Sequence, residues 1–566
     1  MDRHTFPTVT TERPARWATT ALFAATIAVV ILAIGVLTLT AEVVAPADAQ
    51  AALTPAAEAP AADASIAHVP AVSAQAAEGP VRVAVYVGGG TSADKIAATL
   101  RACQACGFDF TGIELEDLVM GRLSTADYDV LLLPAGQDDT KVVYGNEEYG
   151  LGSAAAIGAI RAFVSAGGGI VGLESGGAYL SRDGGLKVYP GKYRRFGKAG
   201  KNDVTITDPT FGSGKQQVYR TAGGGWLMVK SGATEVAANA AGQAVIARCG
   251  YGAGRVVVCT LDPELRGDTQ LDWSIWDDWA MDGRHTDSAG AWKLLGRMVN
   301  WAGTGVATQP ALTEHPNPDG ARVAIVSTYS THGGAWPGLL PAVSRAVEYS
   351  GHVPLAVRGS DIRNGRLTDE AFDVVVFPGG YCWGYETALG AKGGLEVKSF
   401  CRAGGGVMGI CAGSYYLSET IDYYGETFLY LSLFEGVAVG ELDDIAQYPH
   451  AALTPTYTSD PVIGDLGAMQ VYYAGGPFFT QLEASNASVV TTYAYDGTYA
   501  GAPDVIRFTY GQGHVLLTGT HPEVRTGSDV DWISWDDYHE GTNVPWVNPD
   551  NPWRFFDAAM DNWLTK

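Results

Sequence analysis

The sequence predicts an α/β protein in which two tandem domains each form a doubly wound parallel sheet. Three observations support this prediction. At 566 residues, the chain is long enough for two hydrophobic cores. Its short apolar runs are bounded by glycine and alternate with helical segments, as in buried parallel sheets. The same blocks of sequence also occur twice, in the same order, which indicates a duplicated domain.

The N-terminal region differs in composition from the rest of the chain. Residues 20–40 hold no charge and no proline, and about 20 apolar residues suffice for a helix that crosses a bilayer. Arginines precede this stretch, which predicts a cytoplasmic segment at 1–19. We therefore expect a transmembrane anchor or signal sequence at 20–40. An Ala- and Pro-rich linker follows at 41–78.

The fate of this segment stays open between two alternatives. The tripeptide Ala47-Asp48-Ala49 would suit a signal peptidase, and cleavage there would give a secreted protein. The apolar run is, however, longer than the roughly 7–15 residues usual in a signal peptide. We expect a membrane-anchored, extracytoplasmic protein, with secretion after signal cleavage as the alternative.

The duplication defines two domains, at 79–305 and 317–566. Each domain closes on an amphipathic aromatic segment, AWKLLGRMVNW in the first and PWRFFDAAMDNW in the second. The matched blocks are VRVAVYV with ARVAIVS, YDVLLLPAG with FDVVVFPGG, GGGIVGLESGGAYLS with GGGVMGICAGSYYLS, AGGGW with AGGPF, and GYGAGRVVVCTLDPEL with TYGQGHVLLTGTHPEV.

Charge and cysteine content indicate which binding partners and metals the protein is not expected to have. The net charge is −24 and no long basic run is present, which argues against a nucleic-acid partner. Seven cysteines form an odd set, so at least one should be free or intermolecular. The lone C-x-x-C of Cys103 and Cys106 has no second pair, so zinc is not expected. We expect no metal and no cofactor, and the oligomeric state stays open.

The second domain contains a turn suited to a nucleophile. In Gly409-Ile410-Cys411-Ala412-Gly413, flanking glycines allow a sharp bend between an apolar strand and a helix. Such an elbow raises Cys411 out of the sheet, and the amides of the following helix favour its thiolate. The N–H of Ala412 would also face a developing oxyanion.

Two further strand ends supply the groups that a cysteine nucleophile requires. His521 and Glu523 follow the strand HVLLTG, and an extended backbone would point both side chains the same way. The imidazole would serve as base and the carboxylate would fix its tautomer. Gly379 and Gly380 end the strand VVVF, where bare backbone can offer a second oxyanion N–H.

These three pieces, in this order, resemble the class I glutamine amidotransferase-like superfamily. The finer resemblance is to the amino-terminal domain of biotin–protein ligases, and it covers both domains. It implies a flavodoxin-like fold and a Cys411–His521–Glu523 triad. It does not imply biotin transfer, because the glycine- and arginine-containing nucleotide loop of the ligase domain is absent.

The first domain lacks these reactive groups. Glu174 stands where the second domain has Cys411, Asp262 stands where it has His521, and Glu264 matches the glutamate of the triad. Cysteine-type catalysis cannot run there. Three carboxylates could instead bind a hard cation such as calcium or perform acid–base chemistry. We favour a third interpretation, a pseudo-site that now serves packing or an interface.

The sequence therefore predicts a membrane-tethered, extracytoplasmic cysteine hydrolase. Its substrate would be a small-molecule or peptide amide, because cysteine triads of this kind cleave acyl compounds. Water would be the acceptor, since the chain has no synthetase domain to receive ammonia. The alternative is a non-catalytic envelope protein that binds or senses a ligand in the same pocket.

Overall fold

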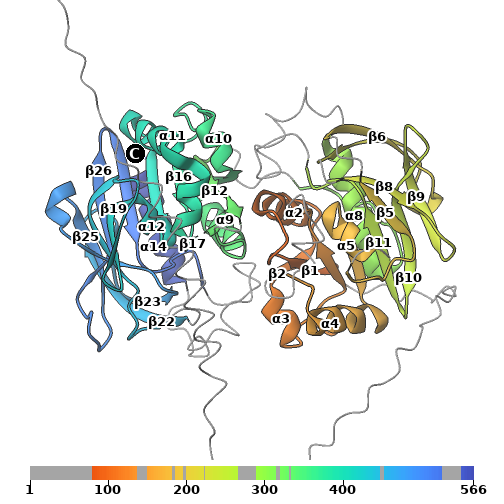
Figure 1. Ribbon diagram of the computed structural model, residues 1–566, viewed down its shortest axis with the longest axis horizontal. Helices are drawn as coiled ribbons and strands as arrows, with labels where there is room; N and C mark the ends of the chain where they lie inside the picture. Colours follow the sequence, from red (N-terminus) through yellow and green to blue (C-terminus); the bar gives the residue numbers. More distant parts are fainter. Residues whose placement is uncertain are drawn as a thin grey trace, which may run out of the picture. The chain divides into compact units, whose positions relative to one another are not determined.

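The computed structural model describes two α/β domains, which appear in Figure 1 in orange to yellow-green and in green to blue. The described residues are 79–136, 150–181, 185–195, 199–221, 224–265, 288–313, 319–330, 333–446, 451–525 and 550–566. The predicted segments at 1–19, 20–40 and 41–78 lie outside them. No helix in the described part of the chain has the length and hydrophobicity that a membrane crossing requires.

The first domain alternates strands and helices up to its elbow and then continues mainly as strands. Its elements are β1 (Arg82–Tyr86), α2 (Ala93–Ala105), β2 (Asp109–Ile113), α3 (Leu115–Val119), β3 (Val130–Leu133), α4 (Ala154–Ser165), β4 (Gly169–Leu173), α5 (Ser175–Leu180), β5 (Lys192–Arg195), β6 (Gly200–Ile206), β7 (Gly214–Arg220), β8 (Gly225–Met228), β9 (Ala233–Asn239), β10 (Ala244–Tyr251), β11 (Gly254–Cys259) and α8 (Ser288–Thr304).

The second domain repeats this order with additional short strands. Its elements are β12 (Arg322–Val326), β13 (Tyr329–Ser330), β14 (Gly333–Ala335), α9 (Leu339–Tyr349), β15 (Val353–Val357), α10 (Gly359–Arg363), β16 (Val374–Phe377), β17 (Gly380–Tyr381), α11 (Cys382–Ala403), β18 (Gly406–Ile410), α12 (Ala412–Leu417), β19 (Ser418–Tyr423), β20 (Glu426–Leu429), β21 (Phe434–Gly440), β22 (Ala452–Asp460), β23 (Gly464–Tyr473), β24 (Phe478–Thr480), β25 (Ser488–Tyr493), β26 (Pro503–Tyr510), β27 (Gly513–Thr518) and α14 (Asn551–Ala559).

The two large sheets have the same topology. The strand order is β2-β1-β3-β4-β11-β10-β9-β6-β7 in the first and β15-β12-β16-β18-β27-β26-β25-β22-β23 in the second. In each sheet the first five strands are parallel and the remaining four are antiparallel. The tandem arrangement of two α/β sheets therefore agrees with the duplicated sequence.

The prediction of wholly parallel sheets is wrong for the outer half of each sheet. Strands there such as β22 are exposed on one face, so they alternate more and less buried residues. The continuous apolar runs used in the prediction occur only in strands that are buried on both faces, such as β3 and β4. The parallel core was therefore visible in the sequence and the antiparallel extension was not.

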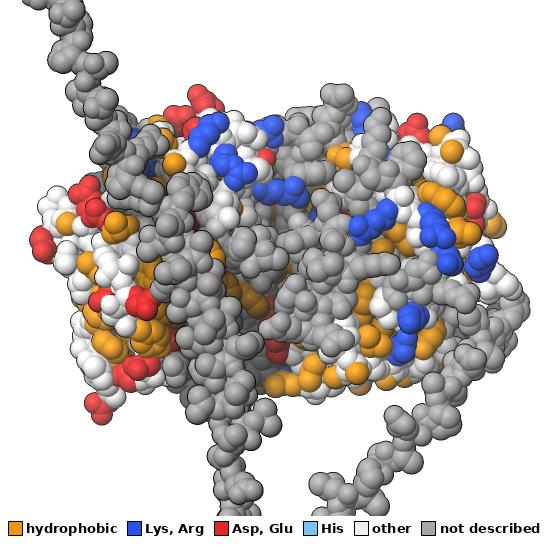
Figure 2. All heavy atoms as spheres, in the orientation of Figure 1, with side chains coloured by type: hydrophobic (Ala, Val, Ile, Leu, Met, Phe, Trp, Pro, Cys, Tyr) orange, Lys and Arg blue, Asp and Glu red, His pale blue; other side chains and the backbone are white. Residues whose placement is uncertain are grey.

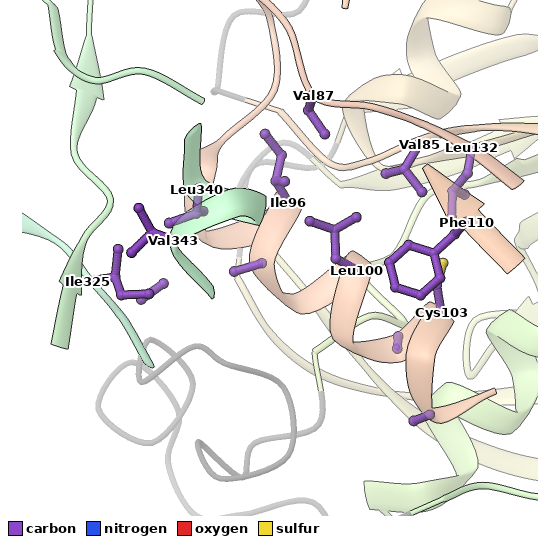
Figure 3. Packing of buried hydrophobic residues seen from close by; sticks show 14 of the residues in the cluster. Val85, Val87, Ile96, Leu100, Cys103, Phe110, Leu132, Ile325, Leu340 and Val343 are labelled. Carbon is purple, nitrogen blue, oxygen red and sulfur yellow. The ribbon is translucent and has the colours of Figure 1, made fainter. Parts of the chain in front are cut away.

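The core of the first domain packs helix α2 against its parallel strands. Figure 3 shows Ile96 and Leu100 of α2 near Val85 of β1, Phe110 of β2 and Leu132 of β3, all buried members of one cluster. Apolar residues at helical spacing on α2 thus cover the sheet face that the strand residues present. This packing fixes the helix that follows the first strand.

Many charged side chains lie on the surface of the described domains. On the face shown in Figure 2, acidic side chains follow the outer edge of the second domain at the left of the view. Basic side chains occur in small groups elsewhere on this face, near the top centre and over the right part of the view.

Candidate active site

Cys411 sits at a strained turn between β18 and α12. Its backbone angles are φ 49° and ψ −108°, a region that a residue with a side chain rarely adopts. Close packing explains the glycines beside it. A Cβ on Gly413 would lie 2.0 Å from the carbonyl oxygen of Phe377, and one on Gly409 would lie 2.9 Å from the amide nitrogen of Ser414. The G-x-C-x-G pattern therefore encodes the elbow.

The Cys411 thiol faces a loop that the sequence analysis did not assign to the site. Its side chain is 4% exposed, and its sulfur donates a weak hydrogen bond to the carbonyl oxygen of Ala474, at 3.5 Å. The backbone N–H of Cys411 donates to the carbonyl of Thr518 on β27. Ala474 is the first residue of the AGGPF block, which matches AGGGW in the first domain. This duplication was the feature of the sequence that could have assigned the loop to the site.

His521 and Glu523 form a buried pair at the end of β27. His521 Nδ1 lies 2.9 Å from Glu523 Oε1, and both side chains are essentially inaccessible to solvent. Two contacts hold the segment in place. The His521 backbone N–H donates to the Tyr472 carbonyl, and the Trp553 indole donates to the Glu523 carbonyl at 2.6 Å. The aromatic segment that closes the domain therefore positions this carboxylate.

The environment of His521 favours its protonated form. Burial lowers the pKa of the imidazole. The charges of Glu523 and Cys411 and hydrogen bonding to both raise it by more, so the pKa becomes about 10. Cys411 therefore lies within interaction range of the ring. Within the described residues, His521 Nε2 has no hydrogen-bond partner of regular geometry. Nδ1 is the ring nitrogen that faces Glu523, so Nε2 is the nitrogen left for another partner.

The glycine turn after β16 lies directly against the imidazole. A Cβ on Gly379 would lie 2.4 Å from His521 Cε1. The Tyr385 hydroxyl donates to the Pro378 carbonyl at 2.7 Å, and the Trp336 N–H donates to the Gly379 carbonyl at 2.9 Å. Gly380 has φ 139°, a conformation that favours glycine. The structure thus brings the glycine turn to His521.

The three predicted strand ends lie at one edge of the sheet. Ala412 is the first residue of α12, directly after Cys411. β16, β18 and β27 are adjacent and parallel, so their carboxyl ends share that edge. The arrangement can combine a thiol, an imidazole paired with a carboxylate, and backbone N–H groups. Such a set can perform acyl transfer.

The first domain builds the same elbow with Glu174 in the place of Cys411. The backbone angles of Glu174, φ 42° and ψ −103°, nearly repeat those of Cys411. Its carboxylate accepts hydrogen bonds from the backbone N–H of Ser175, at 2.5 Å, and from the Ser175 hydroxyl. That hydroxyl in turn accepts from the N–H of Gly136, at 2.7 Å.

These bonds occupy both N–H groups that correspond to the predicted oxyanion donors of the second domain. Ser175 N–H matches Ala412 N–H, and Gly136 N–H matches Gly380 N–H. Ala412 has no hydroxyl, so the second domain cannot form the same hydrogen bonds to these two N–H groups. The pseudo-site is therefore closed by its own side chains.

A lysine that the sequence analysis missed completes the first-domain cluster. Lys95 Nζ lies 3.2 Å from Asp262 Oδ1, and both side chains are buried. Asp262 also accepts from Thr221 N–H at 2.7 Å. Burial and the charge of Asp262 raise the pKa of Glu174 to about 7 and raise that of Glu264 well above its usual range.

The calcium alternative has no support in the described residues. No group of three or more metal-ligating side chains there has the arrangement that a metal ion needs. The Lys95 ammonium already supplies positive charge beside Asp262. All seven cysteines lie in the described residues, and no disulfide joins any two of them.

Comparisons with known proteins agree with the resemblance stated from the motifs. Residues 369–540, which include Cys411, His521 and Glu523, match the family model "Biotin-protein ligase, N terminal". A biotin–protein ligase of Schizosaccharomyces pombe is 28% identical over 162 residues, which cover 26% of this chain. The match spans only 25% of that ligase.

Solved structures of two Thermotoga maritima proteins also align with part of the chain. The PurLQS structure is 17% identical, with 38% of this chain and 95% of that chain covered and a TM-score of 0.28. A glutamine amidotransferase is 14% identical, with 39% and 98% covered and a TM-score of 0.29.

Proposed function

We propose that the second domain is a cysteine-dependent amidohydrolase in which Cys411 is the nucleophile, His521 the proton shuttle and Glu523 the residue that orients His521. The observation that carries this proposal is the position of His521. One ring nitrogen lies 2.9 Å from Glu523, and the ring interacts electrostatically with Cys411. A nucleophile, a base and an orienting carboxylate define this class of site.

The reaction would proceed through a thioester. The Cys411 thiolate attacks the amide carbon and forms a C–S bond, while the carbonyl oxygen gains negative charge beside the N–H groups of Ala412 and Gly380. Collapse breaks the C–N bond, and His521 gives its proton to the departing amine. Water then attacks the thioester and passes a proton to His521. The carboxylic acid leaves and the thiolate is restored.

The location and tether belong to the same proposal. We expect the domain to work outside the cytoplasm, linked to the membrane through residues 20–40, because that stretch is apolar, uncharged and preceded by arginines. The biotin ligase reaction is not part of the proposal. The family match is confined to an N-terminal region of those enzymes.

The test is hydrolysis of a panel of small amides and short peptides by the full chain. We expect release of ammonia or amine by the wild type and complete loss in Cys411→Ala. Cys401→Ala, which removes another buried thiol of the same domain, serves as the matched control and should retain activity. Activity that persists in Cys411→Ala would contradict the proposal and direct attention to Glu174 and Asp262.

The same panel distinguishes the alternative of a non-catalytic binding protein. Amides that bind to both the wild type and Cys411→Ala, with no turnover in either, would support a sensor or ligand-binding role.

A further inference from the structure

A buried carboxylate outside the proposed triad lies against the loop that faces Cys411. Glu441 directly follows β21, and its side chain is 6% exposed. Its Oε2 lies 2.9 Å from the place that a Cβ on Gly475 would occupy. The preceding residue of that loop, Ala474, accepts the hydrogen bond of the Cys411 thiol. Glu441 and the proposed nucleophile therefore lie beside adjacent residues of one loop.

Two tyrosine rings interact with both groups. Burial is the main cause that raises the pKa of Tyr423 and of Tyr473, and the negative charges of Glu441 and Cys411 raise both values further. A direct contact also places Tyr473 beside this segment, because the backbone N–H of Leu442, the residue after Glu441, donates to the Tyr473 hydroxyl at 2.7 Å. The two groups thus share one tyrosine-lined environment.

This environment opens to solvent through a tyrosine pair. Tyr424 is 53% exposed and its hydroxyl donates to Glu441 Oε1 at 2.6 Å. Tyr423 is 37% exposed, and its ring packs edge to face on Tyr424, with 5.0 Å between the ring centroids. The ring of Tyr415, which follows the elbow, lies 6.2 Å from that of Tyr423. The Glu441 carboxylate is thus hydrogen-bonded to a tyrosine that reaches the surface.

The surrounding groups are acceptors and aromatic faces. The Gly475 carbonyl accepts from the Tyr415 hydroxyl at 3.2 Å, and the Gly476 carbonyl accepts from Tyr473 at 2.9 Å. These bonds fix the rings and the loop around the carboxylate. A carboxylate beside electron-rich rings is suited to a small organic cation, which gains charge-assisted hydrogen bonds and cation–π attraction together.

We infer that Glu441, with Tyr423 and Tyr424, forms a subsite for an ammonium group that the substrate carries in addition to its scissile amide. The inference rests on the proposed function, and it adds a residue that determines specificity. Glu441 binds a group that does not react, so it selects which amides reach Cys411.

The first domain shows that the fold itself does not require this carboxylate. Its strand β5 pairs with β8 as β21 pairs with β24. Arg194 pairs with Trp226 there, as Val439 pairs with Phe478 in the second domain. Arg195 therefore matches Gly440, each the last residue of its strand, and the next residue in the sequence is Phe196 in the first domain and Glu441 in the second. The acidic residue is therefore particular to the domain that contains the cysteine.

The test compares ω-amino amides of increasing chain length with their N-acetylated counterparts, which lack the positive charge. We expect the wild type to prefer one length of the charged series over its acetylated form by about 10- to 100-fold in kcat/KM, as for a charge-assisted hydrogen bond. Glu441→Gln keeps an acceptor for Tyr424 but removes the charge, so it should abolish this preference by raising KM. Glu419→Gln, on the exposed face of β19, is the matched control and should retain the preference. Equal rates for charged and acetylated amides in the wild type, or an unchanged preference in Glu441→Gln, would overturn the inference.

Binding to the inactive protein separates this inference from the proposed function. Calorimetry with Cys411→Ala should detect the ω-amino amides and not their acetylated forms, and the signal should disappear in the Cys411→Ala, Glu441→Gln double variant. That result would support the subsite even if no amide were hydrolysed. Hydrolysis without any effect of charge would support the triad and reject the subsite.

Discussion

Lys95 and Leu339 occupy equivalent positions in the two domains. A shared hydrogen bond establishes the equivalence. The backbone N–H three residues before Lys95, that of Ser92, donates to the Ala135 carbonyl. The backbone N–H three residues before Leu339, that of Trp336, donates to the Gly379 carbonyl, and Ala135 and Gly379 are matched in the duplicated blocks. A Cβ on Gly379 would touch both Leu339 and the ring of His521, whereas Lys95 forms an ion pair with Asp262. The replacement of an imidazole by a carboxylate is thus accompanied by the replacement of leucine by lysine.

This relationship explains how the first domain tolerates a buried carboxylate in the place of His521. Asp262 would be costly to bury alone, and Lys95 compensates its charge from the neighbouring helix α2. The pseudo-site is therefore a coordinated set of substitutions rather than the loss of one residue.

Removing this lysine should destabilise the first domain. In Lys95→Met, Asp262 keeps a buried charge without its cation, so we expect a loss of about 3–5 kcal/mol in the free energy of unfolding. Asp262→Asn in the same chain should restore much of it. Denaturant unfolding of the full chain measures both, with Lys215→Met on the exposed strand β7 as control. Equal stability of Lys95→Met and Lys215→Met would show that the ion pair contributes nothing.

The stability of the first domain should also depend on the protonation of Glu174. The folded domain raises the pKa of this carboxyl from 4.5 to about 7 and so binds its proton more tightly than the unfolded chain does. The contribution to stability is complete below about pH 4.5 and is lost as the pH rises through about 7. Glu174→Gln should remove this decline, which unfolding midpoints between pH 4 and 8 would reveal. The control is Glu235→Gln, at a half-buried position of β9. A decline of the same size in Glu174→Gln and in this control would contradict the assignment.

Alkylation should distinguish activation of Cys411 from simple exposure of cysteines. Cys382 is more exposed than Cys411, but burial of its sulfur raises its pKa to about 11. If exposure governed reactivity, Cys382 would react first with iodoacetamide. We expect Cys411 to react first at pH 6, faster than free cysteine, because in the proposed triad a protonated His521 ring beside the thiol would promote loss of its proton. Peptide mapping identifies the modified residue, and His521→Ala should slow the reaction by about tenfold or more.

The charge of His521 should persist to unusually high pH. Its pKa rises from 6.5 in the unfolded chain to about 10 in the folded domain, mainly through Glu523 and Cys411 and against the effect of burial. The associated stability is fully present below about pH 6.5 and is lost as the pH rises through about 10. In Glu523→Gln this loss should occur at lower pH. NMR titration of the ring reports the pKa directly, and identical titrations of the two proteins would exclude the pairing with Glu523.

The sequence by itself determined the features that depend on local backbone requirements and on repetition. Glycines at Gly409 and Gly413 are needed because neighbouring backbone lies within contact of any added Cβ, so the elbow appears in the sequence as a motif. Continuous apolar runs marked the parallel strands because both of their faces are buried. The matching blocks revealed two copies of one topology, and the order of Cys411, His521 and Glu523 along the chain indicated the resemblance to the amino-terminal domain of biotin–protein ligases, which the match over residues 369–540 supports.

Only the tertiary structure decided the features that arise where distant segments converge. Lys95 gives no sign in the sequence that it pairs with Asp262, since α2 and the end of β11 meet only in the folded domain. Glu441 follows an ordinary strand, and its place beside Gly475 depends on how two loops pack. Side-chain charge acts through space, so its partners are set by the fold rather than by spacing along the chain.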